Sequence, residues 1–150
     1  MNWQNEAKYF SKGQEGWSST IYLDIKGIPT FAWGFNCTND LIKRYFPGMF
    51  KPNFMVSQEQ AIPVFDVIYN DSISEAIKYV GKDIWVNLSD NLKIVLSDMC
   101  FAMGYPALSK FIKLKDAIIS GNRVAIRQEI ADSDWARDLP NRSAKLIGMI

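Results

Sequence analysis

Three side chains near the start of the sequence have the types and spacing for acid–base chemistry. Asp24 lies nine residues after Glu15, and Thr30 follows six residues later. A helix end, a tight turn and a returning strand could hold an acid and a base apart with a water molecule between them. Inverting hydrolysis of a glycosidic bond needs this arrangement, with a Glu that stays protonated and an Asp that stays ionised. The pattern therefore predicts two catalytic carboxylates assisted by a hydroxyl group.

Two of these residues also have a purely structural explanation. Asp24 begins an Asp-x-x-Gly sequence, which is typical of a turn whose Asp side chain bonds to the backbone. Glu15 is expected just past a helix, where a glutamate is commonly a solvated surface charge. Spacing alone leaves both alternatives open.

The composition excludes several other kinds of chemistry. The chain has 150 residues, of which 48% are hydrophobic and 22% charged, as in ordinary globular domains. It has no histidine, which excludes imidazole bases and His-ligated zinc or haem. Seventeen basic against sixteen acidic residues give a net charge of +1, too small for a protein that binds nucleic acid by neutralising phosphates. We therefore expect no histidine-ligated metal and no nucleic-acid partner.

The two cysteines and the absence of apolar segments bear on the compartment. Cys37 and Cys100 are too few for a four-thiolate metal site, and two reduced, buried thiols are favoured over the alternative of one disulfide. The first ten residues contain no apolar stretch that could form a signal peptide, and no apolar run is long enough to span a membrane. The chain is expected to fold in the cytoplasm.

Local patterns predict the elements that must position the three residues. A short amphipathic helix is expected to begin at Trp3 and end by Gly13. Two strands, near 20–22 and 30–33, are joined by a turn over 24–27, and a Pro- and Gly-rich loop follows. Ser57 and Gln60 form a capping box for a long helix, in which Pro63 should cause a kink or a later start. Apolar stripes predict further helices over 92–103 and 108–119, with shorter helical pieces after 121.

These elements predict a mostly helical α+β fold. We expect a single domain over residues 1–150, with a small β-containing lobe at about 14–56 and a connecting helix at 57–80. Residues 1–13 and 81–150 would form a larger helical lobe. A cleft between the lobes is the expected ligand site, because sites favour such junctions.

The sequence Glu15-Gly16, followed by Ile21-Tyr22-x-Asp24-x-x-Gly27 and then Thr30-x-x-x-Gly34, resembles the active-site region of the phage-type (T4-like) lysozymes, or endolysins. Residues 99–104 resemble the helix that leads into the cleft of this family, and residues 133–135 and 140–142 resemble its closing segment. The resemblance runs in order over nearly the whole chain and implies a two-lobed lysozyme-like fold.

The resemblance also implies roles for individual residues. Glu15 is identified as the general acid, and Asp24 as the group that activates the attacking water with help from Thr30. Arg142 matches a position whose guanidinium lies near the catalytic glutamate; the alternative is a plain structural salt bridge, and the two interpretations overlap. The implied substrate-binding residues are Asn36, Phe101, Leu114, Glu129 and Arg142.

The sequence departs from the family at two places near the site. Phe35 stands where the family commonly has a histidine, and the residue expected to face it is Ile68 rather than an acid. An ion pair would then be replaced by an apolar contact, which affects pH dependence more than catalysis. Ala102 replaces a common glutamine beside Phe101, which removes one polar contact to substrate.

The function implied by the resemblance is hydrolysis of the β-1,4 bond between N-acetylmuramic acid and N-acetylglucosamine in bacterial peptidoglycan. The chain would be a monomer without cofactor or membrane insertion, kept in the host cytoplasm until released onto the peptidoglycan layer. The alternative is a catalytically silent lysozyme-like protein that binds glycan or forms part of a phage particle.

Overall fold

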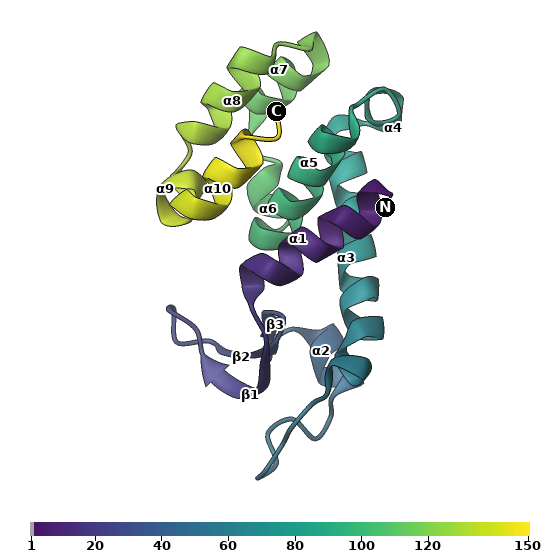
Figure 1. Ribbon diagram of the computed structural model, residues 1–150, viewed down its shortest axis with the longest axis vertical. Helices are drawn as coiled ribbons and strands as arrows, with labels where there is room; N and C mark the ends of the chain where they lie inside the picture. Colours follow the sequence, from purple (N-terminus) through teal and green to yellow (C-terminus); the bar gives the residue numbers. More distant parts are fainter. Residues whose placement is uncertain (1) are drawn as a thin grey trace. The chain divides into compact units, whose positions relative to one another are not determined.

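The computed structural model describes residues 2–150 and has the expected α+β class (Figure 1). Ten helices and one three-stranded antiparallel sheet make up this part of the chain. No helix in residues 2–150 is long and apolar enough to cross a membrane. In chain order the elements are α1 (Trp3–Glu15), β1 (Ser18–Leu23), β2 (Pro29–Ala32), β3 (Phe35–Asn36), α2 (Asp40–Tyr45), α3 (Gln58–Val80), α4 (Lys82–Trp85), α5 (Asp90–Met103), α6 (Tyr105–Leu108), α7 (Ile112–Ser120), α8 (Arg123–Ala131), α9 (Asp134–Asp138) and α10 (Pro140–Ile147).

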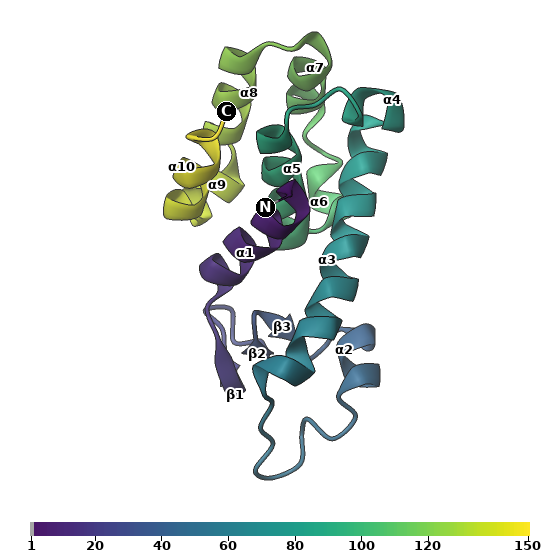
Figure 2. The same ribbon diagram turned by 45° about the vertical axis from the view of Figure 1, so that its right-hand side comes forward.

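The chain forms two compact units (Figure 2). The sheet unit is Tyr9–Ile68, and the helical unit is made of residues up to Lys8 together with Tyr69–Ile150. The sheet unit contains the whole of the expected β-containing segment, 14–56, and adjoining parts of α1 and α3. Glu15, Asp24 and Thr30 therefore all belong to one unit.

A tight turn and the strand pairing next to it fix the geometry of the sheet. In the β1–β2 hairpin Tyr22 lies opposite Thr30, with an irregularity nearer Ser18. In the β2–β3 pair Thr30 lies opposite Asn36, and Gly34 occupies the intervening turn with φ 74°. The strand order is β1-β2-β3, so Thr30 lies on the central strand.

Aromatic rings form the core of the sheet unit. Phe31 is fully buried and meets Phe35, Phe46 and Phe54 edge-on, with ring centroids 5.5, 5.1 and 5.2 Å away. Edge-to-face contact is a favourable geometry for such pairs. Phe35, which stands where the lysozyme resemblance would place a histidine, is thus part of an apolar cluster.

The long helix α3 begins where the capping box predicts. Ser57 Oγ accepts a hydrogen bond from Gln60 N at 3.2 Å, and Gln60 Oε1 accepts one from Ser57 N at 2.9 Å. Pro63 lies inside the helix, so it does not delay the start. Pro63 has no N–H to donate to the carbonyl of Glu59, but both residues are exposed and water can reach that carbonyl.

The helical unit has its most buried element in α5. Ser89 caps this helix, with Oγ accepting from Leu92 N at 3.2 Å, and Gly104 ends it with φ 82°. Every residue from Ile94 to Cys100 is buried. The expected apolar stripe over 92–103 is confirmed as one helix.

Three expectations about local structure were wrong or incomplete. Helix α1 continues to Glu15 instead of ending by Gly13, and the stripe over 108–119 is divided between α6 and α7. The segment expected to be a loop contains β3 and α2, whose cap is Asn39, with Oδ1 accepting from Leu41 N at 2.8 Å. These elements are two and six residues long, too short to give a hydrophobic period.

Both cysteines are free and buried, as the favoured interpretation predicted. Cys37 lies in the sheet unit and Cys100 in the helical unit. Burial and, to a smaller extent, the nearby Glu75 carboxylate together raise the pKa of the Cys100 thiol to about 12. The Sγ atom of Cys100 lies 3.7 Å from Glu75 Oε2.

Candidate functional site

Glu15 is the last residue of α1, and its carboxylate lies against the turn between β2 and β3. The helix ends there because Gly16 adopts φ 71°, a conformation that glycine takes easily, and its N–H donates to Lys12 O at 3.0 Å. A Cβ atom at Gly34 would lie 2.5 Å from Glu15 Oε2 and 3.0 Å from Cδ. Only glycine leaves room for the carboxylate in this half-buried position.

Asp24 closes the β1–β2 hairpin, so its expected role in a turn is real. Its Oδ1 atom accepts hydrogen bonds from Lys26 N at 2.8 Å and Ile28 N at 2.9 Å. Its backbone oxygen accepts from Gly27 N at 2.9 Å. Both side-chain hydrogen bonds end on Oδ1, so the carboxylate is held rigidly while Oδ2 can bind a water molecule.

Thr30 is the middle residue of a row that crosses the sheet. Tyr22, Thr30 and Asn36 are directly opposite one another on β1, β2 and β3, and opposite residues of antiparallel strands share a face. Thr30 is 5% exposed, and its hydroxyl donates to Ile28 O at 2.8 Å. Its oxygen lone pairs are therefore the groups it can offer to a water molecule.

Asn36 is half-buried at the end of this row. Its Oδ1 atom accepts from Thr38 N at 2.8 Å and from Thr38 Oγ1 at 2.6 Å. These bonds fix the orientation of the amide. The Nδ2 group then remains as a donor for a sugar hydroxyl or carbonyl.

Tyr22 links the two carboxylates electrostatically and was missed by the sequence reasoning. Burial raises the pKa of its phenol, and the negative charges of Glu15 and Asp24 raise it further. Both charges therefore act on the same phenol, which stays protonated at neutral pH and can donate a hydrogen bond. Its position two residues before Asp24, opposite Thr30, is the signal that could have identified it.

An aromatic pair lies beside Glu15 in the sheet unit. The ring of Trp17 is 4.7 Å from that of Trp33, the residue before Gly34. The ammonium group of Lys12, three residues before Glu15, lies 4.4 Å from the Trp33 ring centroid. Trp17 is half-buried and Trp33 buried, so the pair supports the turn over which the carboxylate lies.

Arg142 forms a buried ion pair within the helical unit. Its Nε donates to Asp98 Oδ2 at 2.8 Å and its Nη2 to Asp98 Oδ1 at 2.7 Å. Arg142 is 7% exposed and Asp98 is completely buried. This two-pronged contact joins α10 to α5, so the structural reading of Arg142 has direct support.

The other residues expected to contact substrate differ in their surroundings. Phe101 is half-buried on α5, with its ring 5.1 Å from that of Tyr69. Glu129 is half-buried on α8. Leu114 is only 1% exposed within α7, so its side chain is closed to a saccharide and packs in the core instead.

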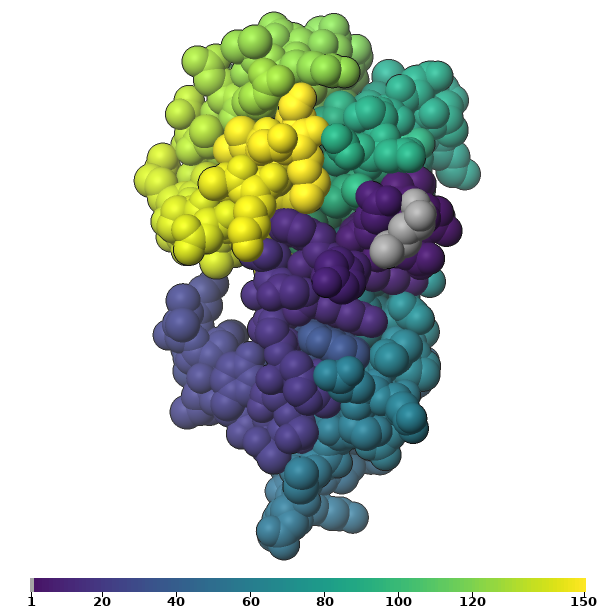
Figure 3. Space-filling view, in the orientation of Figure 1, coloured from purple at the N-terminus to yellow at the C-terminus, as the bar shows by residue number. Residues whose placement is uncertain are grey.

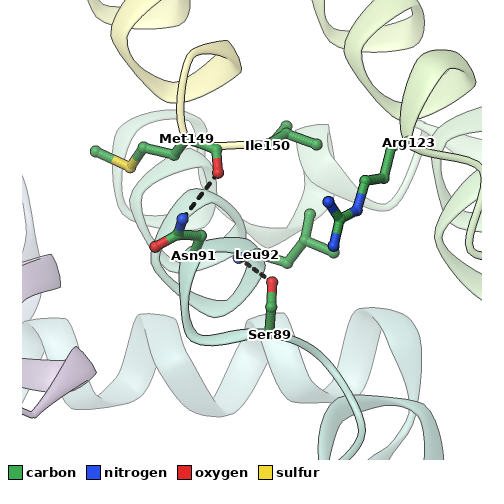
Figure 4. A pocket seen from close by; sticks show the side chains of 6 residues that line it. All are labelled: Ser89, Asn91, Leu92, Arg123, Met149 and Ile150. Atoms are coloured by element: carbon green, nitrogen blue, oxygen red, sulfur yellow. Dashed lines mark hydrogen bonds between the residues drawn. The ribbon is translucent and has the colours of Figure 1, made fainter.

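A small hollow in the helical unit does not include any of these residues. It has a volume of about 110 Å³ and is lined by Ser89, Asn91, Leu92, Arg123, Met149 and Ile150 (Figure 4). Asn91 Nδ2 spans one side by donating to Met149 O at 2.9 Å. Ligand pockets usually occupy about 300 Å³ or more, so this hollow is too small for a disaccharide.

The chemistry of the site is therefore that of carboxylates and hydroxyl groups. Within residues 2–150, no group of three or more His, Cys, Asp or Glu side chains could hold a metal ion.

Comparison of the sequence with models of known protein families and with curated proteins finds no match.

Proposed function

We propose that this protein is a lysozyme, an inverting glycoside hydrolase that cleaves the β-1,4 bond between N-acetylmuramic acid and N-acetylglucosamine in peptidoglycan. It acts as an endolysin, held in the host cytoplasm until it is released onto the cell wall. The main support is the grouping of Glu15, Asp24 and Thr30 in one unit, where Asp24 closes the hairpin whose returning strand carries Thr30 and the Glu15 carboxylate lies against the turn after that strand.

The proposed reaction gives each of the three residues one role. Glu15, protonated, gives its proton to the glycosidic oxygen as the bond to the anomeric carbon breaks. A water molecule between Asp24 Oδ2 and the Thr30 hydroxyl oxygen attacks that carbon from the opposite face. Asp24 accepts one proton of the water, and the other is directed toward Thr30. The products leave Glu15 ionised and Asp24 protonated, and exchange with solvent restores both.

Rigid support explains how such a site could be selective for the transition state. The Asp24 carboxylate is held by two backbone N–H groups, and the Glu15 carboxylate is confined by Gly34. Groups that are already oriented need little reorganisation as charge develops on the sugar. We propose that Asn36 and Phe101 contribute to binding the glycan.

The test is mass analysis of muropeptides released from purified cell walls, with the anomer of the new sugar end recorded. Wild type should release disaccharide products whose new reducing end first appears as the α anomer. Glu15→Gln should lower release by roughly a thousandfold. The matched control is Glu6→Gln, which changes an exposed glutamate in the first turn of the same helix and should behave as wild type.

Two outcomes would reject the proposal. If wild-type protein binds cell walls but releases no muropeptide, the protein is a silent glycan-binding module. If Glu15→Gln releases product at the wild-type rate, the acid lies elsewhere.

A further inference from the structure

The segment between α2 and α3 exposes large apolar side chains to solvent. Residues 45–55, which begin with the last residue of α2 and are here called the 45–55 loop, extend beyond the sheet in both ribbon views (Figures 1 and 2). In the space-filling view the loop forms the narrow lower end of the sheet unit (Figure 3). Tyr45 is 48% exposed, Phe50 66% and Met55 68%. Three such residues on one loop are more than the scattered apolar exposure usual on a protein surface.

The loop is anchored by other residues, so the exposed ones are not needed for its fold. Met49 and Val56 are 3% and 4% exposed, and the Phe54 ring packs on Phe31 in the aromatic core. Val56 N donates to Ser19 O at 2.9 Å, which fastens the end of the loop to β1. The buried Met49 is followed directly by the exposed Phe50, and the exposed Met55 is followed directly by the buried Val56. The exposed side chains therefore project from a firmly held backbone.

Positive charge is concentrated at the same place. Lys43, Arg44 and Lys51 are all exposed, and the sequence has no Asp or Glu between residues 41 and 58. The whole chain carries only +1, so this local excess is not a general property of the protein. Basic groups flanking exposed aromatic and thioether side chains match a surface that is anionic outside and apolar just beneath.

We propose that the 45–55 loop binds the surface of an anionic lipid membrane, with Phe50 and Met55 entering the headgroup region. Lys43, Arg44 and Lys51 then lie level with the lipid phosphates. An apolar contact strengthened by basic residues is how peripheral proteins bind such surfaces without spanning them. This inference is independent of the proposed function, because lipid binding needs none of Glu15, Asp24 or Thr30.

The test uses flotation of the full-length protein with vesicles that contain no peptidoglycan. Wild type should bind vesicles of equal parts phosphatidylcholine and phosphatidylglycerol, and only weakly vesicles of phosphatidylcholine alone. The variant with Phe50→Ser and Met55→Ser should bind the anionic vesicles at least roughly tenfold less. Its control changes Val86→Ser and Val124→Ser, which are 69% and 65% exposed in the helical unit, and should bind as wild type.

A second pair of variants tests whether binding depends on the basic residues of the 45–55 loop and of α2 beside it or on the net charge of the whole protein. Changing Lys43, Arg44 and Lys51 to Gln should weaken binding by roughly a hundredfold, at about fivefold for each charge. Changing the exposed Lys82, Lys110 and Lys113 to Gln lowers the net charge equally and should have little effect.

Circular dichroism confirms that each variant is folded before binding is compared. The inference is overturned if wild type does not bind anionic vesicles, or if the loop variants bind as well as wild type. It is also overturned if both charge variants lose binding equally, or if Phe50 and Met55 instead hold two copies of the chain together in sedimentation.

Discussion

Replacing Gly34 by alanine should abolish most activity while leaving the protein folded. The added Cβ would lie 2.5 Å from Glu15 Oε2, and ordinary contact begins at 3.4 Å, so the carboxylate must move by about 0.9 Å. A displacement of about 1 Å in an oriented reacting group can lower its rate roughly a hundredfold. Because Gly34 has φ 74°, alanine should also lower the free energy of unfolding by about 1 kcal/mol.

The rate of muropeptide release at saturating cell wall measures the first effect, and urea unfolding measures the second. Gly121→Ala is the matched control, because Gly121 has φ 69° at the end of α7 and nothing within 4 Å of an added Cβ. It should lose similar stability but keep full turnover. Wild-type turnover in Gly34→Ala, or equal inactivity in both variants, would refute the reasoning that places the acid at Glu15.

Three further predictions concern other groups. Asp24→Asn keeps an oxygen for the two turn N–H groups, so it should unfold at nearly the wild-type urea concentration but release no muropeptides. Asp24→Ala should be inactive too and should also lower the free energy of unfolding by about 1–2 kcal/mol. Wild-type activity in Asp24→Asn would mean that Asp24 is only a turn residue. Arg142→Ala removes the guanidinium that is hydrogen-bonded to the buried Asp98 carboxylate, so urea unfolding should show a free energy of unfolding lower by about 3–5 kcal/mol. A decrease below about 1 kcal/mol would contradict a stabilising role of this ion pair. Burial raises the pKa of the Cys100 thiol from 9.0 to about 12, so between these pH values the folded state keeps a proton that the unfolded state loses. The free energy of unfolding should therefore fall as pH rises from 9 toward 12, by up to about 1.4 kcal/mol per pH unit. Urea unfolding of Cys100→Ala should show a shallower fall, and a slope identical to that of the wild type would contradict the raised pKa.

Local signals in the sequence were sufficient for the larger elements. The Asp24–Gly27 turn, with strand formers on both sides, predicted the hairpin, and the capping box at Ser57 predicted the start of α3. A stripe of apolar residues predicted α5. These features depend on hydrogen bonds and side-chain periods within a few residues, which the sequence displays directly.

Short elements and the end of α1 depend on contacts farther along the chain. The two residues of β3 form a strand only because β2 is beside them, and α1 continues past Gly13 to carry Glu15 onto the Gly34 turn. The position of a helix end is decided by what the last turn packs against, which local propensity does not contain.

The sequence by itself determined the chemical groups available and the fold class. The lack of histidine and the order of Glu15, Asp24 and Thr30 predict carboxylate chemistry, and the apolar periods predict a mostly helical fold with one hairpin. Only the tertiary structure decided the surroundings of those groups. It buried Leu114, paired Arg142 with Asp98 across 44 positions of sequence, and kept space above Gly34 for a carboxylate. Burial and charge pairing depend on which distant segments meet, and that is a property of the folded chain as a whole.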